Sequence, residues 1–386
     1  MVNFAWLDLA LFSSALLLSS ALVWTTTHLC RKQGWVARPR SDRWHRTTPS
    51  LYGGAPIWLT CIVVSLICIP MSDPKMRQLL AASTFVFVIG MADDILHLRP
   101  LLKLAGQIMG ALFVVGSGFV YPLVHNNDVN FVVSVIWIVG ISNAFNLLDN
   151  MDGLAAGVAV ISAIYLAFFY GGTGSTDYGR IAIIAAAAAA GFLIFNFYPA
   201  RIFMGDCGSL FLGFLLGSLC LPQVTHVSGL PALVLAPCVV LAIPVFDTAF
   251  VSVTRSLRQQ PISQGGTDHT SHRLVQLGFS ERDAVLLLLG LSVVSGAIAL
   301  VARHVLYWHA IELVALWFLV LLLFGIYLQR SDSMTFSREM SAVIPNSVIP
   351  NSGNDRMLIS DATLRQMSTQ PPQNSGDHEP VPTLNT

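Results

Sequence analysis

The sequence predicts an all-α polytopic integral membrane protein with about eleven transmembrane helices. Of its 386 residues, 54% are hydrophobic and only 11% are charged, whereas soluble domains carry about 25% charged residues. The mean hydropathy is +0.66, and apolar runs long enough to cross a bilayer recur along most of the chain. The formal net charge is zero, which gives no reason to expect nucleic-acid binding.

Apolar runs of roughly 17–25 residues mark the predicted transmembrane helices. No basic segment precedes the first run, so we expect a retained helix rather than a cleaved signal peptide. Prolines in the ninth run predict that this helix is kinked or broken. The predicted helices lie near residues 5–29, 54–71, 77–94, 102–124, 131–149, 153–171, 179–198, 208–222, 229–254, 284–303 and 308–328.

Two of these runs contain glycines at GxxxG spacing, in GQIMG at residues 106–110 and in GFLLG at residues 213–217. This spacing lets the backbones of two helices approach each other closely. We expect the glycines to serve packing within the chain, with contact between the subunits of a homodimer as the alternative.

Basic residues are divided unequally between alternate loops. The loop at residues 31–46 alone contains six Lys and Arg, whereas the opposite set of loops contains only Lys75, Arg77, Arg180 and Arg303. The positive-inside rule therefore predicts that the N-terminus lies outside and the C-terminus lies in the cytoplasm.

The composition changes at the end of the last apolar run. Residues 330–386 are rich in Ser, Asn and Pro and show no apolar periodicity, which predicts a disordered cytoplasmic tail. Residues 1–329 form the predicted transmembrane domain.

Polar residues gather at the predicted cytoplasmic ends of the apolar runs. In NAFNLLDNMDGLAAG, two amides and two carboxylates follow one another at intervals of three residues, and we expect the carboxylates of Asp149 and Asp152 to share a helix face. Solvation at a helix end would explain any one of these residues, but five acidic sites on one side of the membrane predict a functional site. The polar residues on that side are Asp93, Asp94, Asn143, Asn146, Asp149, Asp152, Asp206, Asp247, Asp268, His269, His272 and Arg273.

This set of side chains suits a divalent cation and a phosphate. Carboxylates and amides are the ligands that Mg²⁺ prefers, with Mn²⁺ as the alternative, and His and Arg are suited to a phosphate or pyrophosphate. The six cysteines are scattered without a CxxC pair, so neither a disulfide framework nor a zinc site is indicated. No P-loop or GxGxxG precedes a helix, so ATP-driven chemistry is not supported. The pattern predicts metal-assisted phosphoryl transfer at the membrane surface.

Six stretches in order resemble the polyprenyl-phosphate N-acetylhexosamine-1-phosphate transferase family, and they cover roughly residues 35–285: WHRTTPSLYGG, GMADDILHLRPLLKLAGQ, NAFNLLDNMDGLAAG, FNFYPARIFMGDCGSLFLG, PVFDT and DHTSHRLVQLG. The resemblance implies transfer of a sugar-1-phosphate from a UDP-sugar to undecaprenyl phosphate in a bacterial inner membrane. UMP would be released on the cytoplasmic side, and lipid-linked cell-envelope polysaccharide synthesis would begin.

The resemblance also implies a role for each residue of the site. Asp206 and Asp94 would bind Mg²⁺, and Asp93 with Asp94 would act on the acceptor phosphate. Asp149 and Asp152 would support catalysis. The residues that would bind substrate are Asn143, Asn146, Lys103, His269, His272 and Arg273.

The expected mechanism is a one-step attack by the lipid phosphate, because a phosphate monoester with a second pKa of about 6 is largely a dianion at neutral pH. A covalent aspartyl-phosphate is the less favoured route.

Two positions depart from the family pattern: Ala37 stands where an Asp is frequent, and Ser271 replaces one histidine of the His-x-His-His loop. The HRL that ends this loop favours N-acetylglucosamine as the sugar. UDP-N-acetylmuramoyl-pentapeptide or another UDP-aminosugar is the alternative. A secondary transporter is the alternative of a different class, although its acids are expected near the bilayer midplane.

Overall fold

The computed structural model describes residues 6–36, 48–171, 176–221, 239–260, 266 and 268–343, and these residues form twelve helices without a strand. Contacts divide the chain into two units, residues 1–334 and 335–386. The last helix continues to Val343, beyond the predicted end of the transmembrane domain. Ala37, part of the predicted ninth helix and residues 344–386 of the predicted tail lie outside the described residues.

Each predicted transmembrane run contains a helix, and one short helix, α11, was not expected. Six of the helices, α1, α3, α5, α7, α12 and α13, are long and apolar enough to cross a membrane, whereas α2, α4, α6 and α8 are apolar but shorter. The number of crossings and the orientation stay predictions. The helices are α1 (Trp6–Gln33), α2 (Gly54–Cys68), α3 (Pro74–Leu96), α4 (Pro100–Gly116), α5 (Asn127–Leu148), α6 (Leu154–Tyr170), α7 (Thr176–Asn196), α8 (Gly205–Leu219), α10 (Ala242–Leu257), α11 (Thr270–Gln276), α12 (Glu281–Ala302) and α13 (Tyr307–Val343).

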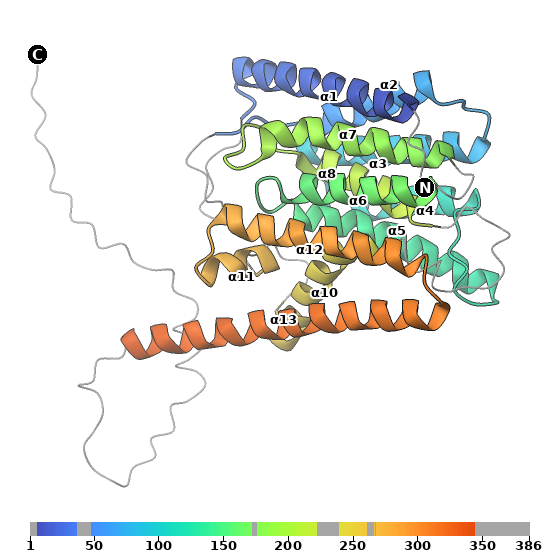
Figure 1. Cartoon of the computed structure of the whole chain (residues 1–386). Helices are drawn as coiled ribbons and strands as arrows, with labels where there is room; N and C mark the ends of the chain where they lie inside the picture. Colours follow the sequence, from blue (N-terminus) through green and yellow to red (C-terminus); the bar gives the residue numbers. More distant parts are fainter. Residues whose placement is uncertain are drawn as a thin grey trace, which may run out of the picture. The chain divides into compact units, whose positions relative to one another are not determined.

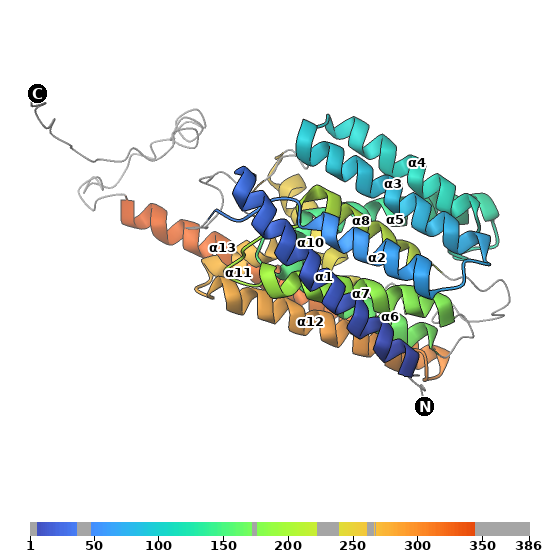
Figure 2. The same cartoon turned by 90° about the horizontal axis from the view of Figure 1, so that it is seen from above.

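Helix α8 lies at the centre of the first unit and is enclosed by its neighbours (Figures 1 and 2). It packs against α2, α3, α5, α6 and α7, and every residue from Cys207 to Leu219 is buried. A helix that is apolar on all sides is compatible with such an enclosed position. The first turn of α8 is therefore fixed by the packing of the whole bundle.

The GxxxG glycines pack against helices of the same chain, as predicted. A Cβ atom added to Gly213 would lie 2.8 Å from the backbone oxygen of Ile141, and one added to Gly217 would lie 3.1 Å from the Ile141 Cβ. Gly106 and Gly110 face Ile89 and Val86 of α3 in the same way. These contacts bring α4 against α3 and α8 against α5.

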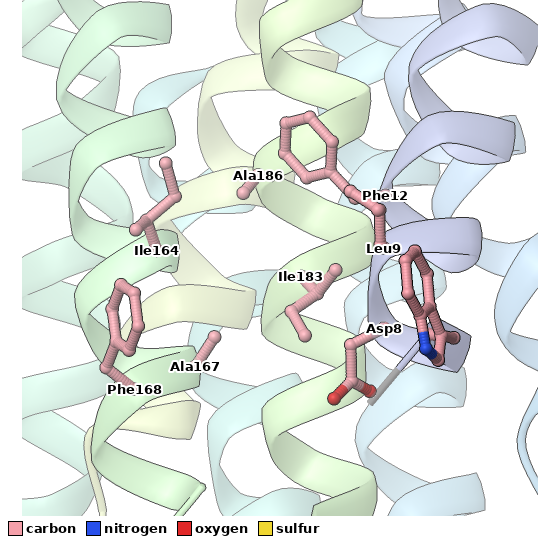
Figure 3. A pocket seen from close by; sticks show the side chains of 9 residues that line it. Asp8, Leu9, Phe12, Ile164, Ala167, Phe168, Ile183 and Ala186 are labelled. Atoms are coloured by element: carbon pink, nitrogen blue, oxygen red, sulfur yellow. The ribbon is translucent and has the colours of Figure 1, made fainter. Parts of the chain in front are cut away.

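The alanine-rich helix α7 forms the floor of an apolar groove between α1 and α6 (Figure 3). The groove has a volume of about 420 Å³ and is lined by residues that include Phe12, Ile164, Ile183 and Ala186. None of the predicted site residues lines it. The groove is therefore separate from the predicted site residues, several of which lie at the ends of α3, α4, α5 and α8.

Candidate active site

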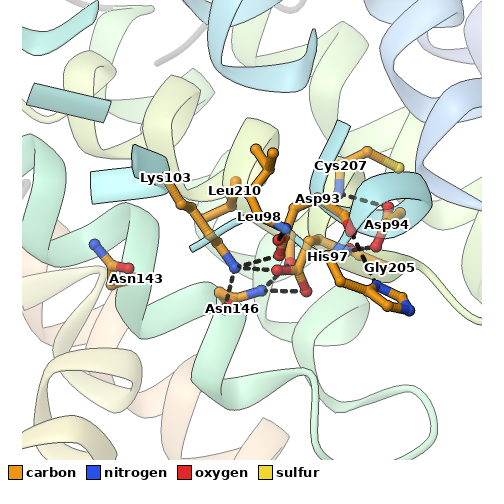
Figure 4. A network of polar contacts seen from close by, with 12 residues as sticks. Asp93, Asp94, His97, Leu98, Lys103, Asn143, Asn146, Gly205, Cys207 and Leu210 are labelled. Atoms are coloured by element: carbon orange, nitrogen blue, oxygen red, sulfur yellow. Dashed lines mark hydrogen bonds and ion pairs between the residues drawn. The ribbon is translucent and has the colours of Figure 1, made fainter. Parts of the chain in front are cut away.

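Four helix ends bring a polar cluster together (Figure 4). Asp93 and Asp94 lie in the last turn of α3, Lys103 in the first turn of α4, Asn146 in the last turn of α5, and Asp206 in the first turn of α8. The helix pairs α3–α4, α3–α8, α4–α5 and α5–α8 are in contact. The structure thus brings five of the predicted site residues into one group, which we call the acidic cluster.

A short turn between α3 and α4 positions the first three of these residues. His97 ends α3 in the left-handed conformation, with φ 52°, and Pro100 begins α4, a position where its fixed φ and missing N–H favour the start of a helix. The backbone N–H of Leu98 donates to Asp93 Oδ1 at 2.8 Å. Because the turn is this tight, Lys103 lies beside Asp93.

Lys103 is the cation of the acidic cluster. Its ammonium group contacts Asp206 closely and lies 3.2 Å from Asp93 Oδ2 and 3.4 Å from Asn146 Oδ1. Asn146 in turn donates to Asp206 Oδ1 at 2.9 Å and to the Ser209 hydroxyl at 3.0 Å. The side chain of Asp206 keeps 30% of its surface exposed, so the cluster is open to a ligand. Oxygen acceptors from three helices therefore converge on one positive charge.

Asp94 has different contacts from its neighbour. Its Oδ1 accepts from the Asp206 N–H at 2.8 Å, and its Oδ2 accepts from the Cys207 N–H at 3.0 Å. These are two of the N–H groups that a helix leaves without an internal partner at its start. A Cβ atom on Gly90 would lie 2.6 Å from the Asp206 backbone oxygen, so only glycine permits this approach of α3. Asp94 thus holds the first turn of α8 through these two hydrogen bonds.

The donor set of the acidic cluster fits a divalent cation that takes few protein ligands. Asp93 and Asp206 both direct an oxygen toward Lys103, and Mg²⁺ is usually bound by one or two carboxylates together with water and substrate phosphates. Within the described residues, no group of three or more His, Cys, Asp or Glu side chains could enclose a metal ion. A metal at this position would therefore depend on substrate oxygens for its remaining ligands.

A second polar group lies at the predicted histidine loop, and we call it the α10–α11 group. Its residues are Asp247, Arg255, Asp268, His269, Thr270, His272 and Arg273. Buried Asp247 of α10 accepts from the Thr270 N–H at 2.9 Å, and it lies 2.8 Å from His269 Nδ1. Arg255 donates to both oxygens of Asp268, at 2.5 and 2.6 Å. Burial opposes ionisation of Asp268, but the hydrogen bonds and charge of Arg255 outweigh it and lower the pKa of that carboxyl.

The two other predicted residues of this loop are also enclosed. The Arg273 side chain is almost fully buried, donates to the backbone oxygen of Asp268 at 3.1 Å, and lies 4.7 Å from the centre of the Phe250 ring. Burial lowers the pKa of His272, and the neighbouring His269 adds to this effect. The loop therefore presents ordered side chains held by carboxylates rather than a solvated basic surface.

Ser271 connects the α10–α11 group to the end of α5. Its buried hydroxyl donates to Asn150 Oδ1 at 2.9 Å. The residue that departs from the family pattern thus has a defined contact with the turn after α5. Asn150 belongs to the stretch that drew attention in the sequence, but its own contact could not be inferred from spacing.

The predicted shared helix face of Asp149 and Asp152 is wrong. Helix α5 ends at Leu148, α6 begins at Leu154, and Gly153 between them adopts φ 78°, so the helical spacing is interrupted. Asp152 is buried, and its Oδ2 accepts from the Ala200 N–H at 2.8 Å. It therefore orders the segment before α8.

Asn143 lies one turn deeper along α5 than Asn146 and contacts Gln107 of α4. Two residues with clear contacts in or beside the acidic cluster, Gln107 and Ser209, were not identified from the sequence, and neither was Arg255 of the α10–α11 group. The first two could have been found, because Gln107 is four residues after Lys103 and Ser209 three after Asp206, which places each on the same helix face as its neighbour. No sequence signal marks Arg255.

Comparison with known proteins supports the resemblance. The family model described as Glycosyl transferase family 4 matches residues 76–223, which include the whole acidic cluster. A probable undecaprenyl-phosphate N-acetylglucosaminyl 1-phosphate transferase from Bacillus subtilis is 31% identical over 292 residues, which cover 73% of this chain and 81% of that relative.

Two further relatives extend the comparison. A phospho-N-acetylmuramoyl-pentapeptide-transferase from Lacticaseibacillus paracasei is 35% identical over 209 residues, 47% of this chain and 64% of that protein. A decaprenyl-phosphate N-acetylglucosaminephosphotransferase from Mycolicibacterium smegmatis is 28% identical over 295 residues, 66% of this chain and 72% of that protein. The chain therefore belongs to glycosyl transferase family 4, a family of phospho-sugar transferases.

Proposed function

We propose that the chain transfers a sugar-1-phosphate, with N-acetylglucosamine-1-phosphate as the favoured group, from a UDP-sugar to undecaprenyl phosphate. UMP is released, and the lipid product begins cell-envelope polysaccharide synthesis on the cytoplasmic side of a bacterial inner membrane. The observation that carries this proposal is the acidic cluster, in which carboxylates and an amide from separate helices surround one cation. The name of the Bacillus subtilis relative supports the choice of sugar and acceptor.

In the proposed reaction an oxygen of the lipid phosphate attacks the β-phosphorus of the donor. The new bond joins that oxygen to phosphorus, and the bond from the β-phosphorus to the bridging oxygen breaks. The bridging oxygen leaves with UMP. The acceptor is largely a dianion at neutral pH, so the main barrier is repulsion between two phosphates, which positive charge at the site reduces.

Asp93 and Lys103 are the residues proposed to meet the acceptor phosphate. Lys103 supplies an ammonium group beside the partly exposed carboxylate of Asp206, and Asp93 Oδ2 lies 3.2 Å from the same ammonium group. Asp93 is therefore better placed than Asp94 to orient the phosphate or accept its last proton. Both oxygens of Asp94 face the start of α8, so Asp94 is proposed to hold Asp206 in place.

Asp206, whose carboxylate is partly exposed, is the residue proposed to hold Mg²⁺, or Mn²⁺ in its place. Asp94, the second ligand expected from the sequence, accepts instead from the first turn of α8. A bound divalent ion would neutralise phosphate charge and favour departure of UMP. Asn146 holds Asp206 in the orientation this requires, through its hydrogen bond to Oδ1.

The α10–α11 group is proposed to bind the donor. His269 is held by Asp247 through Nδ1, so Nε2 is the ring nitrogen proposed to meet the pyrophosphate or sugar. His272 and Arg273 follow on the same short helix. Asp149 stays a predicted contact of the nucleotide side, after the end of α5 that the Ser271–Asn150 hydrogen bond joins to this loop.

The test is a transfer assay with the purified full chain in lipid nanodiscs. Undecaprenyl phosphate is incubated with a panel of labelled UDP-sugars, with Mg²⁺, Mn²⁺ or EDTA. The expected result is equal amounts of labelled lipid and UMP with UDP-N-acetylglucosamine, abolished by EDTA. Product only with UDP-N-acetylmuramoyl-pentapeptide would move the chain to that branch. Ion-coupled solute uptake by proteoliposomes without a lipid product would replace the enzyme with a transporter.

A further inference from the structure

A pair of amide side chains joins α4 to α5 below the acidic cluster. Asn143 Nδ2 donates to Gln107 Oε1 at 2.5 Å, and Gln107 Nε2 lies 3.4 Å from Asn143 Oδ1. Asn143 Nδ2 also donates to the backbone oxygen of Val139 at 2.8 Å. Gln107 is completely buried. A buried amide without a hydrogen-bond partner is destabilising, so these two side chains depend on each other.

The amide pair is the next contact along the helices from the one that holds Lys103. Lys103 of α4 contacts Asn146 of α5, and one turn deeper Gln107 of α4 contacts Asn143 of α5. The residue number increases along α4 while it decreases along α5, as antiparallel helices require. Both contacts therefore depend on the same placement of α4 relative to α5.

On the side of α4 that faces α3, the two glycines make apolar contacts. Gly106 faces the Ile89 side chain and Gly110 faces Val86. Apolar contacts are not directional, so they tolerate small shifts along or around a helix, whereas a hydrogen bond weakens steeply when its angle changes. Single buried polar contacts are known to specify register between packed helices. The amide pair is a buried directional contact between α4 and α5, one turn away from the Lys103–Asn146 contact.

We propose that Gln107 and Asn143 are positioning residues that set α4 against α5, and so keep the Lys103 ammonium between Asp206, Asp93 and Asn146. This inference rests on the proposed function, since it assigns Lys103 a place at the acceptor phosphate. A displacement of about 1 Å at a catalytic group can reduce the rate about 100-fold. The amide pair would thus affect the transfer step without touching substrate.

The test compares Gln107→Leu, Asn143→Leu, the double variant, and the exchange Gln107→Asn with Asn143→Gln. Gly140→Ala is the matched control, because a Cβ atom at Gly140 of α5 meets no atom within 4 Å. We expect each single variant to lower kcat roughly 10- to 100-fold with little change in the donor KM. The double variant should lose no more than the worse single variant, and the exchange should recover most of the rate.

A second measurement does not depend on activity. The rate at which a lysine-reactive reagent labels Lys103, followed by mass spectrometry, should rise several-fold in both single variants and stay unchanged in Gly140→Ala. This readout separates the two proposals: wild-type protein without lipid product would refute the proposed function, while the labelling rates would still test the positioning of Lys103.

Three results would overturn the inference. An increased donor KM in Asn143→Leu, with Gln107→Leu unaffected, would make Asn143 a direct donor contact. A lower Tm with unchanged kcat per folded molecule would reduce the pair to a structural tie. Unchanged Lys103 labelling in both single variants would show that the ammonium group keeps its position without the pair.

Discussion

Replacement of Asp94 by asparagine tests the difference between the two adjacent aspartates. The carboxylate accepts one N–H from Asp206 and one from Cys207. Hydrogen bonds to a charged group contribute about 1.5–3 kcal/mol, and neutral ones about 0.5–1.5 kcal/mol. Asp94→Asn weakens one bond and directs an NH₂ group at the other N–H, so the expected loss in the free energy of unfolding is about 2–4 kcal/mol.

Amide hydrogen exchange measures this loss at the helix start itself. Exchange of the Asp206 and Cys207 amides should accelerate at least about tenfold in Asp94→Asn, and the Tm should fall. Asp93→Asn is the matched comparison, because its carbonyl can still accept from Leu98 and only the partly exposed contact with Lys103 is weakened. Its expected loss is under about 1 kcal/mol.

Transfer activity should fall in both variants, for different reasons: loss of the direct phosphate contact in Asp93→Asn and loss of Asp206 positioning in Asp94→Asn. The reasoning is refuted if exchange at residues 206–207 is the same in Asp94→Asn as in the wild type. It is also refuted if Asp93→Asn is the less stable of the two.

Three further predictions concern Lys103 of the acidic cluster and two residues of the histidine loop, Ser271 and His272. Lys103→Met should reduce transfer at least about 100-fold, since two carboxylates then repel each other and the acceptor; a rate within tenfold of wild type contradicts this. Ser271→Ala removes the hydrogen bond to Asn150, worth about 0.5–1.5 kcal/mol, so donor KM should rise about two- to tenfold; Ser271→Thr should retain the wild-type value. Burial and His269 lower the pKa of His272, so the unfolded chain binds this proton more readily. The free energy of unfolding should therefore have its full value above about pH 6.5 and decrease as the pH falls below that value. A profile of Tm against pH that is the same in His272→Gln as in the wild type would contradict this prediction.

The helices and the acidic cluster were largely predictable from the sequence. Apolar runs predict where helices form, and polar residues at their ends are solvated or functional, so Asp93, Asn146 and Asp206 could be grouped from the sequence. Lys103 was added to them only by the family resemblance. The short helix α11 was missed because seven residues are too few for a periodic signal.

The division of roles between neighbouring residues could not be predicted. Asp93 and Asp94 are the same residue type at adjacent positions. Only the turn after α3 and the approach of Gly90 to α8 decide that Asp93 accepts from Leu98 while Asp94 accepts from the first turn of α8. Spacing of three residues predicted a helix face through Asp152, but the positive φ of Gly153 interrupts it. The spacing of polar residues does not show where a helix ends. The same spacing is compatible with a helix that stops at Leu148 and with one that continues through Asp152.

The enclosure of α8 has a consequence for how the surrounding membrane acts on the enzyme. A bilayer thicker or thinner than a helix exerts its force on surfaces that lipid touches, and from Cys207 to Leu219 this helix has none. Stretching or thinning of the lipid must first tilt the outer helices before it reaches Asp206. The helix that carries Asp206 is therefore separated from the surrounding lipid by its neighbours along the length from Cys207 to Leu219.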